Sequence, residues 1–279
     1  MPIPSRTAPL ALALALAAGA PAAQGQESAS ERSAVRAAAR QPERQDDDST
    51  NLYRAAIDKV RPAIVQIKYV TSDASGMMGG GESEEQTDGV LVSADGLVLV
   101  SNFSFGGAAA LFGGAPTPQD IRVFIGDDTE GARASVLARD SERDLTWIKL
   151  DKAPEKDLPH VSLDGDAEAE VGDRILQVGR ASEFYGHAPK VSEGRVIGET
   201  SRPRELLFAS QLLQELGMPV LNDRAEVIGF LVLQLPSQEE MQAAGGFMGG
   251  AFQPELCILP LGEVRSATEN ARALDEDEE

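Results

Sequence analysis

The segment that decides the fold is residues 88–100, which reads DGVLVSADGLVLV. Two short runs rich in valine and leucine, 89–93 and 97–101, make up most of it, and the Asp95-Gly96 pair between them is typical of a tight turn. The segment therefore predicts two strands joined by a short turn.

Similar short apolar runs recur on both sides of this segment, separated by glycine, aspartate and proline. In the first half we predict strands at 63–70, 89–93, 97–101, 121–125, 132–138 and 145–150. In the second half we predict strands at 161–163, 174–179, 190–199, 206–210, 218–221, 227–234 and 256–259. A polar linker bounded by prolines, 153–159, lies between the halves. Two sets of about six short strands predict an all-β protein with two small barrels side by side.

Helical spacing appears only at the two ends of this region. Residues 51–60 place Leu52, Ala56, Ile57 and Val60 on one side of a short helix that Pro62 would end. A closing helix is predicted at 262–273, followed by an acidic tail at 274–279.

The N-terminus has the pattern of an export signal. Arg6 supplies a positive charge, and 8–18 is an apolar run too short to span a bilayer. We therefore expect a signal peptide at 1–26, with an uncleaved anchor as the alternative, and an exported protein, periplasmic or secreted, of bacterial origin. Residues 27–50 are polar and end in an acidic run, as expected of a disordered linker.

Composition excludes several classes of function. The chain has 279 residues and a formal net charge of −20, and because only five of its acids lie in 275–279, most of this charge belongs to the folded part. Such a surface argues against nucleic acids and anionic membranes as partners. One cysteine, Cys257, excludes an intramolecular disulfide, and with His160 and His187 as the two histidines we expect no metal site and no cofactor.

Six segments in order resemble the trypsin-like serine proteases of the HtrA/Deg type. They are 60–67 (VRPAIVQI), 88–100, 143–150 (RDLTWIKL), 171–179 (VGDRILQVG), 191–197 (VSEGRVI) and 217–229 (GMPVLNDRAEVIG). The resemblance implies the chymotrypsin fold, two six-stranded antiparallel β-barrels with a cleft between them, over 51–272. Barrel one would span about 51–153 and barrel two about 158–262. The chain ends soon after the closing helix, so we expect no PDZ domain.

The resemblance breaks at the catalytic residues. Proteases of this type need a serine nucleophile, a histidine base and a buried aspartate that orients the histidine. Carried over position by position, the aspartate is Asp144 and the serine position holds Leu216. The histidine position holds Phe103, or Ser104 if one residue is inserted, and neither can act as a general base. Neither Phe103 nor Leu216 can transfer a proton or attack a carbonyl, so we expect no catalytic residues in this degenerate triad.

The loop that would carry the nucleophile and the oxyanion hole is also altered. Gln214 and Met218 stand where the family has glycines, Glu215 adds a carboxylate and Gly217 is kept. An anion at this place opposes the negative charge that acyl transfer develops.

Two glycine- and methionine-rich stretches, 76–81 and 245–250, interrupt the strand pattern. Their apolar residues are Met77, Met78, Phe247 and Met248. They are either flexible loops or adaptable binding surfaces, for which methionine is well suited.

Three functions remain open from the sequence. The first is an inactive protease fold that binds a protein or peptide partner or acts as a scaffold. The second is an active serine endopeptidase with an unconventional site. The third is a regulatory partner of an active protease homologue. The sequence leaves the oligomeric state undetermined.

Overall fold

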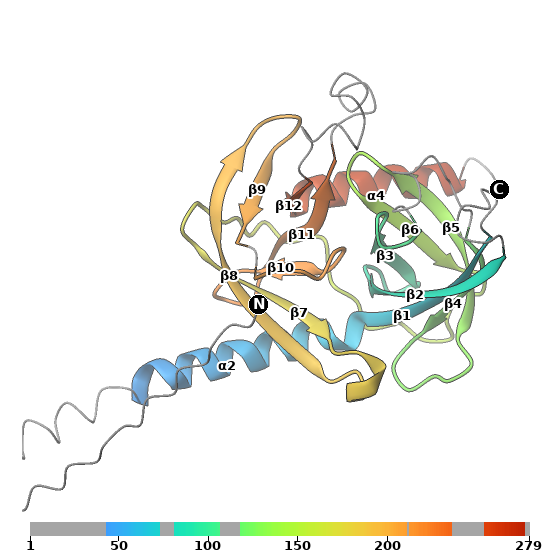
Figure 1. Ribbon diagram of the computed structural model, residues 1–279, viewed down its shortest axis with the longest axis horizontal. Coiled ribbons are helices and arrows are strands. Elements are labelled where there is room, and N and C mark those ends of the chain that lie inside the picture. The colour runs from blue at the N-terminus through green and yellow to red at the C-terminus, as the bar shows by residue number, and fades with distance from the viewer. Residues whose placement is uncertain (1–42, 73–80, 107–117, 211, 236–253, 277–279) are drawn as a thin grey trace, which may run out of the picture. The chain divides into compact units, whose positions relative to one another are not determined.

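The computed structural model describes residues 43–72, 81–106, 118–210, 212–235 and 254–276, and their strands form two closed six-stranded barrels (Figure 1). Both barrels belong to one compact unit, Asp47–Glu279. All strand pairs are antiparallel. The predicted fold class is thus confirmed.

Barrel one contains the first six strands, paired in the order β1-β2-β3-β6-β5-β4. Their bounds are β1 Ile64–Ser72, β2 Glu82–Leu91, β3 Leu97–Ser101, β4 Gln119–Phe124, β5 Ala132–Asp140 and β6 Leu145–Leu150. Strands β2 and β3 are the hairpin of residues 88–100, and they pair Val90 with Leu99 and Leu91 with Val98.

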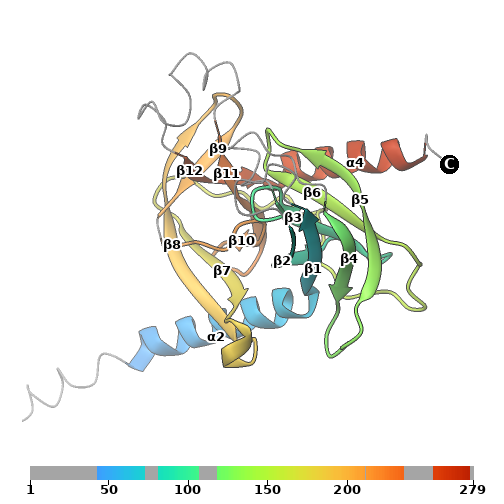
Figure 2. The ribbon, with the colours of Figure 1, turned by 45° about the vertical axis from the view of Figure 1, so that its right-hand side comes forward.

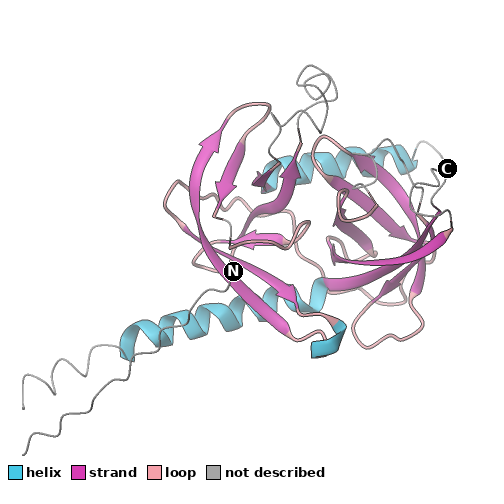
Figure 3. Ribbon diagram, viewed as in Figure 1, coloured by secondary structure: helices cyan, strands magenta, loops and turns pink. Residues whose placement is uncertain are grey.

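Barrel two contains the last six strands, paired in the order β10-β11-β12-β9-β8-β7. Their bounds are β7 Arg174–Arg180, β8 Pro189–Thr200, β9 Leu206–Ala209, β10 Pro219–Leu221, β11 Val227–Gln234 and β12 Glu255–Pro260. Figure 3 shows the two sets of strands, with helix at the start and end of the described chain and at one hairpin tip, the 3-10 turn η3 (Glu183–Tyr185).

Two predicted strands differ clearly from the structure, whereas the ends of most others differ by one or two residues. Strand β2 begins at Glu82 rather than at residue 89, because polar, exposed residues 82–86 pair with β1 although they carry no apolar pattern. The predicted strand at 161–163 is wrong. Val161 is buried, and its N–H donates a single backbone hydrogen bond to Leu91 O (2.9 Å), which is not continued into strand pairing. The carbonyl oxygen of Leu163 accepts a hydrogen bond from the Arg265 side chain (2.7 Å) and not from a neighbouring strand.

Helix α2, Glu43–Val60, precedes barrel one through the 3-10 turn η1, Arg61–Ala63. It begins eight residues before the predicted start, within the segment expected to be a disordered linker. The predicted face is confirmed, since Ala56 and Val60 are fully buried and Leu52 and Ile57 pack against the core. Tyr53 Oη donates to Glu193 Oε2 (2.5 Å), which also pairs with Arg174, and so joins α2 to barrel two.

Helix α4, Leu261–Glu276, contacts strands of both barrels, β5 from the first and β11 and β12 from the second (Figure 2). Trp147 Nε1 donates to Thr268 Oγ1 (3.0 Å), and Thr268 donates in turn to Val264 O (2.7 Å). The helix therefore holds the two barrels together, and it takes in the first three residues of the expected acidic tail.

Some predictions fall outside the described residues. These are the signal peptide at 1–26 and the apolar residues of the two glycine-rich stretches, Met77, Met78, Phe247 and Met248. No helix in the described part of the chain is both long and apolar enough to cross a membrane.

Candidate functional site

Asp144 lies at the point where the β5–β6 turn enters barrel one. Its backbone is left-handed (φ 57°), a conformation that aspartate and asparagine tolerate better than other residues with a side chain. Its side chain is nearly fully buried, with 3% of the residue exposed. A buried carboxylate is costly unless it is hydrogen-bonded, so its partners decide what it can do.

Three groups of the chain donate hydrogen bonds to the Asp144 carboxylate. Ser101 Oγ lies 3.0 Å from Oδ1 and 2.9 Å from Oδ2. The backbone N–H of Phe103 donates to Oδ1 (2.7 Å), and that of Leu233, on β11 of the other barrel, donates to Oδ2 (2.9 Å). Both carboxylate oxygens are thus occupied by donors that belong to the fold itself.

Burial nevertheless dominates the ionisation of this group. Desolvation raises the pKa of Asp144 from 3.8 to about 6, although the hydrogen bonds from Leu233, Phe103 and Ser101 favour the ionised form and oppose the rise. At neutral pH the group is still mainly ionised.

The turn after β3 is organised around Ser101, which is fully buried. Its hydroxyl accepts the N–H of Ser104 (3.2 Å), and its carbonyl accepts the N–H of Phe105 (3.0 Å). Phe105 fills the apolar core under the turn, with its ring centroid 4.5 Å from that of Tyr69. Phe103, the residue at the expected histidine position, is half-buried and uses its backbone to hold Asp144.

The loop at 214–218 is held in place by side chains from β7 and β8. Gln177, fully buried on β7, donates to Glu215 O (2.8 Å) and accepts from Glu215 N (3.0 Å). Lys190 Nζ lies 2.5 Å from Glu215 Oε1, so the carboxylate that the sequence places in this loop is neutralised by an ion pair. Leu216, at the expected serine position, is half-buried and packs against the second apolar cluster of barrel two.

Gly217 is the residue through which this loop meets barrel one. Its φ is 75°, and a Cβ atom added to it would lie 2.5 Å from the backbone nitrogen of Ser101. A side chain is excluded there both by backbone conformation and by the approach of Ser101. The kept glycine thus has a packing role in this structure.

Neither histidine of the chain reaches this site. Both lie among the described residues, and neither donates to or accepts from Asp144. His160 is exposed, and its Nδ1 lies 3.0 Å from Leu158 O. His187 sits in the β7–β8 hairpin with φ 53°. His160 is thus a surface residue and His187 a loop residue in this structure.

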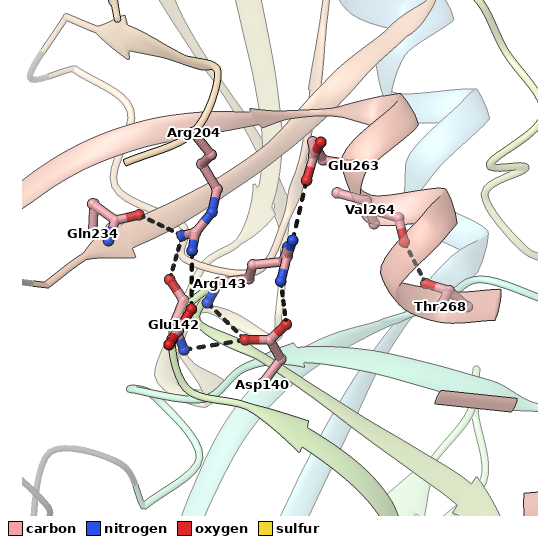
Figure 4. Close-up of polar contacts among 8 residues, drawn as sticks. All are labelled: Asp140, Glu142, Arg143, Arg204, Gln234, Glu263, Val264 and Thr268. Atoms are coloured by element: carbon pink, nitrogen blue, oxygen red, sulfur yellow. Dashed lines mark hydrogen bonds and ion pairs between the residues drawn. The ribbon is translucent and has the colours of Figure 1, made fainter. Parts of the chain in front are cut away.

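An outer polar network fixes the turn that carries Asp144 (Figure 4). Arg143 pairs with Asp140 (2.9 Å) and with Glu263 of α4 (3.4 Å). Arg204, which precedes β9, donates to Glu142 O (2.6 Å) and to Gln234 Oε1 (3.1 Å). The turn of barrel one is therefore tied to α4 and to the segment before β9, and Arg204 extends this network to Gln234 on β11.

The chemistry open to these groups is limited. Among the described residues no serine hydroxyl forms a hydrogen bond with a histidine, and no set of three His, Cys, Asp or Glu side chains is placed to hold a metal ion. Ser101 has a carboxylate partner, but its complete burial keeps it from any substrate. The thiol of Cys257 is also buried, and desolvation raises its pKa to about 11.

Two closed barrels with a buried aspartate between them define a trypsin-like fold. The family model of the trypsin-like peptidase domain matches residues 87–230, and this chain belongs to that family. The fold is similar to the crystal structure of the serine endoprotease from Yersinia pestis, with a TM-score of 0.51 and 19% sequence identity. That match covers 78% of this chain and 66% of the Yersinia chain. This chain therefore spans slightly less than two-thirds of the length of the Yersinia protein. No curated protein matches this chain.

Proposed function

We propose that this protein is an exported, catalytically inactive member of the trypsin-like family that binds a protein or peptide partner. The observation that carries the proposal is the set of donors on Asp144. In an active triad this carboxylate orients a histidine, which takes the proton of the serine. Here neither histidine of the chain bonds to Asp144, whose donors are Ser101 and the N–H groups of Phe103 and Leu233.

The nucleophile loop supports the same proposal. Leu216 has no proton to give, and the ion pair of Lys190 with Glu215 and the clamp of Gln177 stabilise the altered loop. Removing one member of a triad lowers the rate by several orders of magnitude. A chain without the base and without the nucleophile therefore has no route to acyl transfer through this site.

Export is part of the proposal and is supported by the pattern of residues 1–26. Fractionation of a bacterial host that expresses the full chain tests it. The expected result is a protein in the periplasm or the medium with a mass that lacks about the first 26 residues, and a full-length protein in the cytoplasm would contradict it.

The catalytic proposal is tested on protein purified from that exported fraction. We expect no cleavage of casein and no labelling by a fluorophosphonate probe, with an active trypsin-like protease as the positive control. Leu216→Ala and Asp144→Asn serve as matched variants, because a contaminating protease would cleave equally in all three preparations. Cleavage by the unmodified chain that either variant abolishes would overturn the proposal and favour an unconventional endopeptidase.

A further inference from the structure

A large open hollow lies on barrel two. It has a volume of about 1100 Å³ and is lined by the segment 165–170, the β8–β9 hairpin and the start of α4. We call it the acidic groove. Leu206, Ile228 and Leu261 in its lining are buried side chains and give it an apolar floor.

The charge of the acidic groove is strongly one-sided. Six carboxylates line it against a single cation, Arg265; the six are Asp166, Glu168, Glu170, Glu199, Glu205 and Glu263. Arg265 is already engaged, because it donates to the carbonyls of Leu163 and Gly165 and pairs with Asp166 (3.5 Å).

Four of these carboxylates have no partner in the described part of the chain. Asp166 pairs with Arg265 and Glu263 with Arg143. The side chains of the other four are exposed and take part in no ion pair or hydrogen bond; they are Glu168, Glu170, Glu199 and Glu205. They face the same hollow from two different segments. Like charges held together repel one another, and a cationic ligand would relieve this repulsion.

The rim of the acidic groove also offers backbone groups. Among the described residues, the N–H groups of 166–169 have no hydrogen-bond partner, although the flanking N–H groups of Asp164 and Glu170 are bonded to Ser162 and Asp173. Ala167 and Ala169 are half-buried, whereas Glu168 and Glu170 are exposed. Unpaired backbone groups of this kind can pair with the backbone of an added extended peptide.

We propose that the acidic groove binds an extended cationic peptide in which lysine or arginine alternates with small apolar side chains. The basic side chains would pair with Glu168, Glu199 and Glu205, and the apolar ones would pack on the floor. This inference rests on the binding role proposed above and names its site and the chemical class of its partner.

The test uses the full exported chain and three fluorescein-labelled peptides of equal length, with repeats of Lys-Ala, Lys-Ser and Glu-Ala. We expect the Lys-Ala peptide to bind most tightly by fluorescence anisotropy, the Lys-Ser peptide less tightly and the Glu-Ala peptide not at all. The affinity should fall with added salt, because the contributing charges are exposed. The triple variant Glu168→Gln, Glu199→Gln, Glu205→Gln should weaken Lys-Ala binding on the order of tenfold.

A matched variant separates the acidic groove from the overall charge of the chain. Glu82→Gln, Glu84→Gln, Glu85→Gln removes the same charge from exposed positions on β2 of barrel one and should leave the affinity unchanged within about twofold. Equal weakening by both variants would mean nonspecific attraction to an acidic protein and would overturn the proposal.

Sedimentation distinguishes a peptide from a second copy of the chain as the occupant of the acidic groove. If a second copy occupies the acidic groove, the groove variant will change the sedimentation coefficient and leave peptide binding unaltered, which contradicts the proposal.

The casein assay on the same variants tests catalytic inactivity separately from peptide binding. Cleavage would refute catalytic inactivity without changing the peptide affinities. Loss of specific binding would refute the acidic groove without touching the cleavage result.

Discussion

The carboxylate of Asp144 and the carboxylates along the acidic groove lie in contrasting surroundings. Asp144 is buried and receives hydrogen bonds from three groups of the fold, one of them from the opposite barrel. Glu168, Glu199 and Glu205 are exposed and have no partner in the described residues. A carboxylate therefore has a structural role where the fold supplies hydrogen-bond donors for it. A carboxylate without such donors remains available to a ligand.

The largest expected effect is that of Asp144→Ala on stability. The change leaves Ser101 and the N–H groups of Phe103 and Leu233 without an acceptor and places alanine at a φ of 57°. We expect the free energy of unfolding, measured by urea denaturation, to fall by roughly 3–5 kcal/mol.

Two controls accompany this measurement. Asp144→Asn keeps the shape and tolerates the backbone conformation, and should cost about 1–3 kcal/mol. Glu205→Ala removes an exposed, unpartnered carboxylate and should change stability by less than about 0.5 kcal/mol. Similar losses in Asp144→Ala and Glu205→Ala would break the contrast between the two places.

The second effect concerns pH. The pKa of Asp144 in the folded chain, about 6, lies above its ordinary value of 3.8, so the folded state binds this proton more tightly than the unfolded state does. This tighter proton binding stabilises the folded state. The stabilisation is fully present below the ordinary pKa of 3.8 and is lost as the pH rises through about 6.

Comparison of the unmodified chain with Asp144→Asn isolates this contribution from the many surface acids. Between about pH 5 and about pH 7.5, the free energy of unfolding of the unmodified chain should fall by roughly 1–2 kcal/mol more than that of the variant. Parallel pH profiles of the two proteins would show that the buried carboxylate does not titrate in this range.

The smallest effect is expected in the acidic groove. The triple variant Glu168→Gln, Glu199→Gln, Glu205→Gln removes three charges that repel one another and contact no cation. Its free energy of unfolding should be unchanged or slightly raised, by no more than about 0.5 kcal/mol per substitution. A clear loss of stability in urea denaturation would mean that these carboxylates have structural partners after all.

Local pattern predicted the strands that are buried and apolar. Strands β3, β6 and β11 have the predicted bounds, because their runs are almost wholly buried and therefore apolar throughout. The pattern missed the start of β2, where polar residues form a strand because they pair with β1. It wrongly predicted a strand at Val161, which is buried but is not part of a strand ladder. Burial and strand pairing are separate properties, and a periodic pattern reports only the first.

The candidate site was predicted in part. The sequence identified Asp144 as the residue at the aspartate position, but it did not predict that the N–H of Phe103, 41 residues earlier in the chain, donates to it. It did not predict Leu233 N–H, which comes from β11, or the inward turn of the Ser101 hydroxyl. These contacts join residues far apart in the chain, and no local pattern encodes them.

The sequence by itself determined the two-barrel fold, the lack of a histidine and a serine at the expected triad positions, and the strong negative charge. These are properties of residue type and order. Only the tertiary structure decided that Ser101 and Leu233 complete the shell of Asp144, that Gly217 packs against the backbone of Ser101, and that unpaired carboxylates from separate segments meet in one groove. The physical reason is that burial, desolvation and charge repulsion depend on distances in space, which chain order does not contain.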